Sequence, residues 1–301
     1  MIYSAIAFPG LGIEVDPTQT LQIGPLSIHI YGLIIAIGLM LAVIYGCKRC
    51  NQFGFSVDDL TDGVLFIVPL AILCARLYYC VFEWDSYKAN PISVLYIWQG
   101  GLAIYGGVIG AALGIVVFGL VKKIKIAAVL DITSLGFLIG QSIGRWGNFF
   151  NREAFGAETD SFLRMGLFKR VTESGMILDA TTMTYYHPTF LYESIWNAVG
   201  FVLLHFLSKK RKYDGQVALG YLAWYGLGRT FIEGLRTDSL YWGNLRVSQI
   251  LAAVTCFCGV ALLMFQGFRE HDPAKLQGSI YRAKLDALEA EETAEEEETE
   301  E

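Results

Sequence analysis

Seven long apolar segments constrain the fold of this chain more than any other feature of its sequence. Of its 301 residues, 54% are hydrophobic and 17% charged, and the apolar residues come in blocks rather than in amphipathic stripes. A helix that crosses the hydrocarbon core of a bilayer needs about 20 predominantly apolar residues. Segments near that length occupy residues 27–47, 64–83, 102–121, 132–150, 188–207, 216–234 and 247–268. The sequence therefore predicts an all-α integral membrane protein built as a seven-transmembrane helical bundle.

Lysines and arginines in the short loops predict how this bundle is oriented. Lys48 and Arg49 follow the first segment, three lysines lie within residues 122–125 after the third, and "KKRK" at 209–212 follows the fifth. Cytoplasmic loops carry an excess of these residues. The N-terminus is therefore predicted to face out and the C-terminus in.

The same pattern divides the chain into regions. We expect an external lead-in over 1–26, transmembrane segments 1–4 over 27–150, a small external head over 151–187, and segments 5–7 over 188–268. Residues 269–301 form the rest, and the last sixteen residues hold ten acids and no base. Such a charge run lacks apolar surface to bury, so it indicates a largely disordered cytoplasmic tail. Without those ten acids, residues 1–285 carry 23 bases and 19 acids, a net charge of +4, and nothing favours nucleic-acid binding.

Small residues recur every four positions in two of the segments. Gly106, Gly110 and Gly114 lie in the third segment, and Gly136, Gly140 and Gly144 in the fourth. Stripes of this kind let membrane helices approach closely. The six cysteines form no convincing disulfide framework, and we expect free thiols.

Costly polar residues gather at one predicted depth. Charges inside a bilayer are expensive and mark functional interiors. With the orientation above, six segments bring polar groups to the outer half of the membrane: His29, Tyr31, Arg76, Gln99, Tyr105, Arg145, His187, Glu193, Tyr225, Arg229 and Glu233. Asp131 lies instead at the cytoplasmic start of the fourth segment, where the helix dipole favours an acid at the helix N-terminus.

Two of these segments carry arginines at helical spacing. Arg145, Asn148 and Arg152 would share a face if the fourth helix continued, and Arg229, Glu233 and Arg236 repeat the spacing. Snorkelling to the headgroups would explain a single arginine, but not two converging stripes. Guanidinium groups present a planar fork of donors to phosphate. These residues therefore indicate a site for an anionic lipid at headgroup depth in the outer leaflet.

Several common catalytic motifs do not occur in the sequence. It contains no H-E-x-x-H metal motif and no GxxxxGK phosphate loop, and its one G-x-S-x-G match, "GQSIG" at 140–144, lies within the fourth apolar segment rather than at the strand-to-helix turn of a nucleophile elbow. A serine triad or a zinc site is accordingly not expected, and we expect no metal or nucleotide cofactor.

Five motifs, in order, resemble one family, the bacterial phosphatidylglycerol–prolipoprotein diacylglyceryl transferases. They are "IHIYGL" at 28–33, "GGLAIYGGVIG" at 100–110, "GRWGNFFNREAFG" at 144–156, "HPTFLYE" at 187–193 and "GLGRTFIEGLR" at 226–236. The resemblance covers roughly residues 15–270. It implies a seven-span enzyme of the bacterial cytoplasmic membrane with its active site toward the outer leaflet.

The resemblance also implies an activity and roles for individual residues. The diacylglyceryl group of phosphatidylglycerol would pass to the lipobox cysteine in the signal peptide of a prolipoprotein, forming a thioether and releasing glycerol phosphate in the first step of lipoprotein maturation. Arg145 would bind the lipid phosphate in a site shaped by Asn148, Asn151 and Glu153 and lined by Tyr31. A second charged cluster would comprise Arg229, Glu233 and Arg236, with His187, Tyr225, Glu193 and Arg76 as possible supporting residues.

Tyr105 stands where the family pattern has histidine. A phenol, with its unperturbed pKa of about 10, is a poor base at neutral pH, although it can donate a hydrogen bond. The predicted reaction is direct displacement by the cysteine thiolate, favoured by the cationic Arg145 and Arg229. If a separate base is needed, Glu233, His187 and Tyr105 are candidates in falling order.

Two other classes of protein stay open from the residues alone. A transporter or lipid flippase would carry charges near the midplane and interrupted helices. A receptor or scaffold would bind anionic lipid without chemistry.

Overall fold

In a computed structural model of the chain, the described residues are 2–24, 26–170, 183–237, 241–243 and 245–300, and they form two compact units. The first unit comprises residues 1–42, 134–210 and 219–269, and the second comprises 43–133, 211–218 and 270–301. Helices α1 (Ile30–Phe53), α5 (Ile126–Asn151) and α7 (Gln216–Leu235) each run from one unit into the other. The units are described separately below.

Each predicted apolar segment falls on one long helix. The other four are α2 (Val57–Phe82), α4 (Ile104–Lys122), α6 (Thr189–Lys209) and α8 (Val247–Gly267). Within the described residues, six of the seven, all but α7, are long and apolar enough to cross a membrane. Helix α7 has a similar length but carries Arg229 and Glu233. The chain is therefore a mostly helical, multi-pass membrane protein, while the seventh span and the orientation stay predictions.

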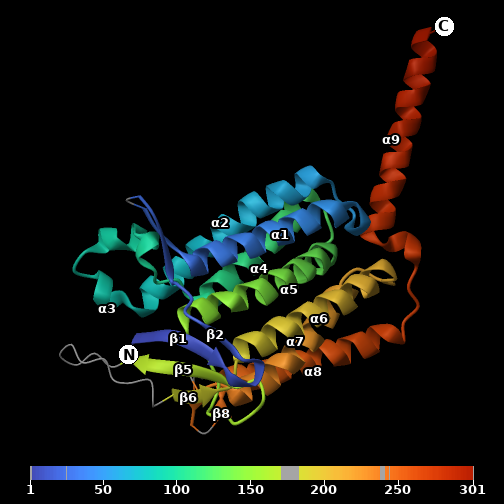
Figure 1. Cartoon of the computed structure of the whole chain (residues 1–301). Coiled ribbons are helices and arrows are strands. Elements are labelled where there is room, and N and C mark those ends of the chain that lie inside the picture. The colour runs from blue at the N-terminus through green and yellow to red at the C-terminus, as the bar shows by residue number, and fades with distance from the viewer. Residues whose placement is uncertain (1, 25, 171–182, 238–240, 244, 301) are drawn as a thin grey trace. The chain divides into compact units, whose positions relative to one another are not determined.

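The first unit contains a four-stranded antiparallel sheet that the sequence did not predict. Its strands are β1 (Ile2–Phe8), β2 (Ile13–Val15), β5 (Met165–Arg170) and β6 (Met183–Tyr186), in the order β2-β1-β5-β6 (Figure 1). Ile6 and Phe8 of β1 pack with Met165, Leu167 and Phe190 in a buried apolar cluster. The lead-in and the head, predicted as separate regions, therefore share one sheet. Residues 171–182 of the predicted head lie outside the described residues.

Two small hairpins complete the described strands of this unit. They pair β3 (Thr20–Ile23) with β4 (Leu26–His29), and β7 (Tyr241–Trp242) with β8 (Leu245–Arg246). The predicted close approach at the Gly136–Gly140–Gly144 stripe also lies in this unit. A Cβ atom on Gly38 of α1 would lie 3.5 Å from the Cα of Gly140.

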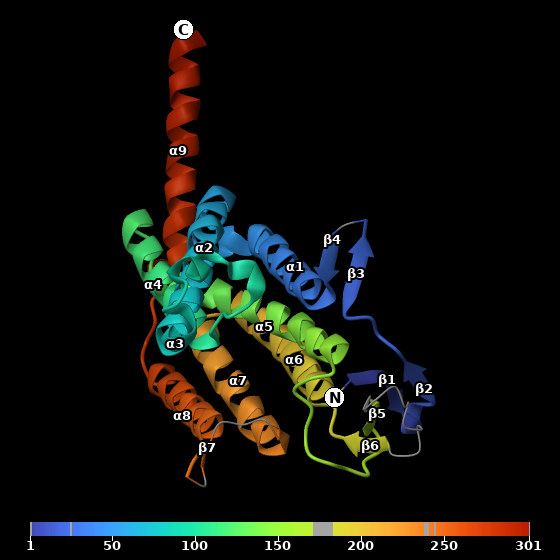
Figure 2. The ribbon, with the colours of Figure 1, turned by 90° about the vertical axis from the view of Figure 1, so that its left-hand side faces the viewer.

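In the second unit, α2 and α4 lie side by side (Figure 2). Helix α2 begins with a capping box in which Ser56 and Asp59 satisfy each other's backbone N–H groups. The predicted glycine stripe of α4 faces α2, since a Cβ atom on Gly110 would lie 2.7 Å from the Cβ of Cys74 and one on Gly114 would lie 3.1 Å from Cγ1 of Ile67. The backbones approach this closely because glycine has no side chain.

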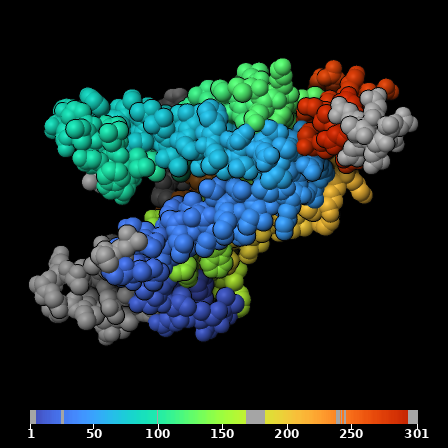
Figure 3. All heavy atoms as spheres, turned by 90° about the horizontal axis from the view of Figure 1, so that it is seen from above, coloured from blue at the N-terminus to red at the C-terminus, as the bar shows by residue number. Residues whose placement is uncertain are grey.

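Apolar side chains remain exposed along the helices of the second unit. Helix α2 is visible in Figure 3, and its exposed residues include Leu65, Leu73, Leu77 and Val81. Exposed apolar side chains on long helices are expected where lipid, rather than water, is the solvent. All six cysteines are free, as predicted.

Arg76 of α2 organises the connection to α4. This connection contains α3 (Trp84–Tyr87) and two 3-10 turns, η2 (Pro91–Leu95) and η3 (Ile97–Gln99). The five N–H groups of the Arg76 guanidinium donate to the backbone carbonyls of Ser93, Val94, Tyr96, Gly100 and Gly101. The guanidinium also lies over the ring of Tyr87, at 5.1 Å from its centroid. Because its donors are taken by carbonyls, this arginine holds a loop together.

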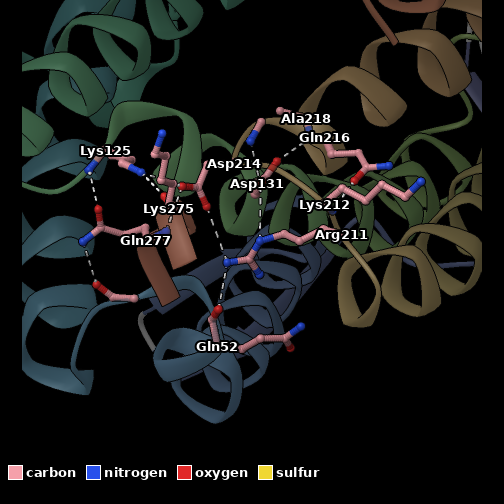
Figure 4. A network of polar contacts seen from close by, with 12 residues as sticks. Gln52, Lys125, Asp131, Arg211, Lys212, Asp214, Gln216, Ala218, Lys275 and Gln277 are labelled. Atoms are coloured by element: carbon pink, nitrogen blue, oxygen red, sulfur yellow. Dashed lines mark hydrogen bonds and ion pairs between the residues drawn. The ribbon is translucent and has the colours of Figure 1, made fainter. Parts of the chain in front are cut away.

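A buried polar network joins the loops at the predicted cytoplasmic end of the second unit (Figure 4). Asp131 is fully buried and accepts hydrogen bonds from the backbone N–H groups of Gly215 and Ala218, both at 2.9 Å. Its side chain therefore caps the N-terminus of α7. We had predicted instead that it lies at the N-terminus of its own helix. Arg211 lies between Asp131 and Asp214 and donates to the carbonyl of Gln52.

The C-terminal segment joins this network. It contains a 3-10 turn, η4 (Pro273–Lys275), and α9 (Gln277–Glu300). The Gln277 backbone N–H donates to Asp214 at 2.8 Å, and its side-chain amide donates to the carbonyl of Gly54 at 3.3 Å. The structure thus has a helix where the acidic composition favoured a largely disordered tail. Alanine, leucine and glutamate are strong helix formers, and they dominate this segment.

The packing of α4 on α2 gives a first test, Gly110→Ala. Its Cβ would lie 2.7 Å from Cys74 Cβ and 2.9 Å from the backbone of α2. Overpacking of this kind should lower the free energy of unfolding by about 2 kcal/mol. The matched control is Gly107→Ala, whose Cβ would have its nearest neighbour at 3.7 Å. Thermal unfolding in detergent checks the difference, and equal melting temperatures for the two variants would contradict the packing.

A second test concerns Arg76. Arg76→Lys keeps the charge but offers three donors in place of five. We expect faster amide hydrogen exchange over residues 93–101, measured by mass spectrometry, because two or more carbonyls lose their partner. Lys88→Arg, at an exposed ion pair of the same connection, is the control and should leave exchange unchanged. Unaltered exchange in Arg76→Lys would show that the guanidinium does not hold the loop.

Candidate functional site

A single buried carboxylate, that of Glu193, joins three arginines in the first unit. Arg145 of α5 forms an ion pair with Oε2 of Glu193, and Arg229 of α7 donates to Oε1 at 2.6 Å. Arg236, just beyond α7, lies 3.8 Å from the same Oε1. Arg229 also forms an ion pair with Glu233, one turn later on α7. Helices α5, α6 and α7 therefore converge on Glu193 of α6.

Burial differs between the two signs of charge in this cluster. The carboxylates are the deeper groups, whereas the arginines keep partial exposure, with side-chain exposed fractions of 4% for Glu193, 2% for Glu233, 23% for Arg145, 16% for Arg229 and 11% for Arg236. Three guanidinium groups face two carboxylates, which leaves one excess positive charge. The exposed side of the cluster is therefore cationic and suits an anionic ligand.

The polar residues that follow Arg145 on α5 form a second part of the site. Arg145 Nη1 lies 3.3 Å from the amide oxygen of Asn148, and the amides of Asn148 and Asn151 donate to Oε1 of Glu153 at 3.0 and 3.3 Å. The structure thus brings together all four residues of this predicted set. Tyr31 of α1 lies against the same helix, because a Cβ atom on Gly147 would come within 2.6 Å of its ring.

Arg152 departs from the predicted arrangement. Helix α5 ends at Asn151, and Arg152 has a φ of 55°, in the left-handed region. Its guanidinium donates to Asp16 at 2.7 Å and to the carbonyl of Pro17 at 2.8 Å, in the N-terminal lead-in. A face shared with Arg145 was predicted only if the helix continued, and because α5 ends at Asn151 the spacing does not extend to Arg152.

Two further predicted residues lie in the first unit. Tyr225 lines a small pocket with Glu193, Arg229 and the buried amide of Asn197. His187 precedes α6, and its Nδ1 lies 3.3 Å from the hydroxyl of Tyr192. Sequence reasoning did not single out Asn197, although it lies four residues after Glu193 and hence on the same face of α6.

The remaining two predicted residues belong to the second unit. Tyr105 lies in the first turn of α4 and is exposed, and Arg76 donates to backbone carbonyls as described above. The carbonyl contacts favour a structural role for Arg76 over a supporting role in the site. Tyr105 stays a predicted site residue.

The importance of Glu193 exceeds what the sequence indicated. We had predicted it only as a possible supporting residue, with Glu233 as the acid of the second charged cluster. In the structure it contacts arginines from both neighbouring segments. An available signal was its position, because it is the one acid between residues 188 and 207, within an apolar segment. Within the described residues, no cluster of histidine, cysteine and acidic side chains could hold a metal ion.

Glu193→Gln tests whether this carboxylate holds the cluster together. The change keeps the shape of the side chain but removes the charge that pairs with Arg145 and Arg229. Breaking a buried ion pair from one side should cost about 3 kcal/mol of stability. Thermal unfolding in detergent is the measurement, and Glu153→Gln, the same change at an exposed position, should cost much less. Equal shifts for both variants would show that Glu193 is not the central contact.

Comparison with known proteins adds a family match and several close relatives. The family described as prolipoprotein diacylglyceryl transferase matches residues 18–265. A phosphatidylglycerol–prolipoprotein diacylglyceryl transferase of Listeria monocytogenes is 40% identical over 279 residues, covering 91% of this chain and 100% of that protein. Proteins with the same name from Bacillus licheniformis and Clostridium novyi are 42% and 43% identical, covering 85% and 81% of this chain and 94% and 93% of their own lengths.

Proposed function

This chain belongs to the prolipoprotein diacylglyceryl transferase family and is a membrane transferase, and we propose that it uses the arginine cluster around Glu193 to act on phosphatidylglycerol. The acceptor is the thiol of the lipobox cysteine in the signal peptide of a prolipoprotein. The names of the relatives support both substrates. The assignment of the site rests on one observation: three partly exposed arginines pair with two buried carboxylates.

In the proposed site, Arg145 and Arg229 bind the lipid phosphate. Glu193 anchors both guanidinium groups, Asn148 also contacts Arg145, and Glu233 also pairs with Arg229. Each guanidinium has five N–H groups, so part of each remains for the ligand. Asn148, Asn151 and Glu153 shape the side near Arg145. Arg236 adds a third positive charge, and Tyr31 lines the site.

The chemistry is a displacement at carbon. The cysteine sulfur attacks the glyceryl carbon that carries the phosphate, a C–S bond forms, and the C–O bond to phosphate breaks. The electron pair of that bond leaves on glycerol phosphate, whose negative charge the arginines stabilise. The same arginines favour the thiolate over the thiol. The substrate already carries its leaving group, so the reaction needs no metal or nucleotide.

The ion pairs of Glu193 and Glu233 affect which group can accept the proton of the cysteine thiol. Glu193 and Glu233 are both buried and already held in ion pairs with arginines, so neither carboxylate is placed to contact the thiol. This argues against Glu233 as the first candidate. His187 is then the better candidate in the first unit, with Tyr105 a further one, and activation of the thiol by the arginines alone is the simplest scheme.

We place the enzyme in the bacterial cytoplasmic membrane with the arginine cluster toward the outer leaflet. The apolar helices and the basic loops after α1, α4 and α6 support this placement. Cysteine labelling with a membrane-impermeant reagent, at positions in the loops, tests it.

The activity is tested with purified protein, phosphatidylglycerol and a lipobox peptide. A thioether-linked diacylglyceryl peptide and free glycerol phosphate should appear together. Arg145→Ala should reduce turnover by at least about 100-fold, because the leaving phosphate loses a preorganised partner. Arg164→Ala, which removes an arginine of the sheet region, is the control and should retain activity.

Two outcomes would contradict the proposal at different points. Lipid binding without either product would indicate a lipid-binding protein rather than a transferase. Full turnover by Arg145→Ala would leave the family activity intact and show that this arginine is not in the site.

A further inference from the structure

Two reciprocal contacts lie next to Glu193 on either side of α6. The first joins α6 to α5. Ser142 donates its hydroxyl to the backbone carbonyl of Ser194 at 2.9 Å, and Ser194 donates to the carbonyl of Ser142 at 2.8 Å. The indole of Trp146 adds a hydrogen bond to the Ser194 hydroxyl at 3.2 Å. Ser194 directly follows Glu193, and Ser142 lies one helical turn before Arg145.

The second contact joins α6 to α7. The indole N–H of Trp196 donates to the carbonyl of Trp224 at 3.0 Å, and that of Trp224 donates to the carbonyl of Trp196 at 2.9 Å. The two rings are stacked, with centroids 4.3 Å apart and an angle of 17° between their planes. Trp196 lies one turn after Glu193, and Trp224 lies five residues before Arg229.

Glycines make the tryptophan contact possible. Each tryptophan has a glycine four residues later, Gly200 in "WNAVG" and Gly228 in "WYGLG". A Cβ atom on Gly200 would lie 2.3 Å from Nε1 of Trp224, and one on Gly228 would lie 2.2 Å from Nε1 of Trp196. Each indole therefore lies directly on the backbone of the opposite helix, where any larger residue would displace it.

These contacts fix the register of the helices as well as their spacing. Adjacent residues of a helix differ by about 1.5 Å along its axis, so a slip of one residue would break both bonds of a reciprocal pair. In an apolar interior water cannot replace them, which makes an unpaired indole N–H or serine hydroxyl costly. The serine contact thus sets the register of α5 relative to α6, and the tryptophan contact that of α7. Both contacts involve residues of α6 within one turn of Glu193.

We propose that Ser142, Ser194, Trp196 and Trp224 are positioning residues of the transferase. They act through Glu193: by holding α6 in register with α5 and α7, they place its two oxygens where Arg145 and Arg229 both reach them. The guanidinium group of each arginine is thereby placed where it can bind the phosphate of the lipid. This inference rests on the proposed function of the arginine cluster, but none of the four residues needs to touch a substrate.

The test compares turnover in variants that remove one contact each. Trp196→Phe combined with Trp224→Phe keeps aromatic bulk but removes both indole donors. We expect kcat to fall by about 10- to 100-fold, because misplacing catalytic groups by about 1 Å costs that much. KM for phosphatidylglycerol should change little. Trp98→Phe, at a site where tryptophan is 74% exposed, should be silent.

The serine contact is tested in the same way. Ser142→Ala combined with Ser194→Ala should also lower kcat, with KM changed little. The matched control is Thr255→Ala, which removes a hydroxyl that bonds only within its own helix, at 2.6 Å from the carbonyl of Leu251. Turnover is measured per monodisperse protein after size-exclusion chromatography, so loss of folded enzyme does not count as loss of kcat.

A double-variant experiment separates positioning from general stability. If the tryptophans act through Arg229, their replacement should cost much less in an Arg229→Lys enzyme than in the parent enzyme. Near-ultraviolet circular dichroism reports the stacked pair independently, since its exciton signal should disappear in either single tryptophan variant.

Three results would overturn this proposal. They are full turnover in the doubly substituted tryptophan and serine enzymes, an equal loss with and without Arg229→Lys, and a loss confined to KM. None of them bears on the arginine cluster itself. Failure of the proposed function has a different signature, which is lipid binding without product by the parent enzyme, and failure of the site assignment would appear as full turnover by Arg145→Ala.

Discussion

The ion pairs of Glu193 with Arg145 and Arg229 are the interaction on which the first unit depends. Three helices supply these groups, and none of the three residues is a neighbour of another in the sequence. Burying one carboxylate in an apolar bundle is expensive unless cations surround it. Arginines in turn need a carboxylate, because their charge is as costly to bury. Each group is tolerated because the others are present.

This mutual dependence has a functional consequence. A buried carboxylate leaves the more exposed arginines as the surface of the cluster, with one positive charge in excess. The arginines are then held in place before a ligand arrives, and in the proposed reaction little reorganisation is needed when charge develops on the leaving phosphate. Asn148, in the last turn of α5, and Glu153, beyond its end, extend the same site.

Close helix contacts provide the frame. Glycines let α4 lie against α2 and let the indoles of Trp196 and Trp224 reach backbone carbonyls. Polar groups that contact carbonyls recur elsewhere, in Arg76 with its five acceptors and in Arg211 with Gln52. In a chain dissolved in lipid, such contacts bind helices and loops together where apolar surface alone gives no preference for protein over solvent.

The sequence by itself determined the class of the protein and named most members of the proposed site. Length and apolarity located the seven long helices, since a bilayer demands about 20 such residues per span. Helical spacing also paired Arg229 with Glu233, because residues four apart share a face.

Only the tertiary structure decided what joins these residues. Spacing within one helix cannot show which of several acids three helices share, so Glu193 was ranked below Glu233. Nor could it show that α5 ends before Arg152, or that β1 and β5, separated in the sequence by α1, α2, α4 and α5, pair in one sheet. Those outcomes depend on contacts between segments that are distant in the sequence, and such contacts stabilise the protein only once the helices have packed.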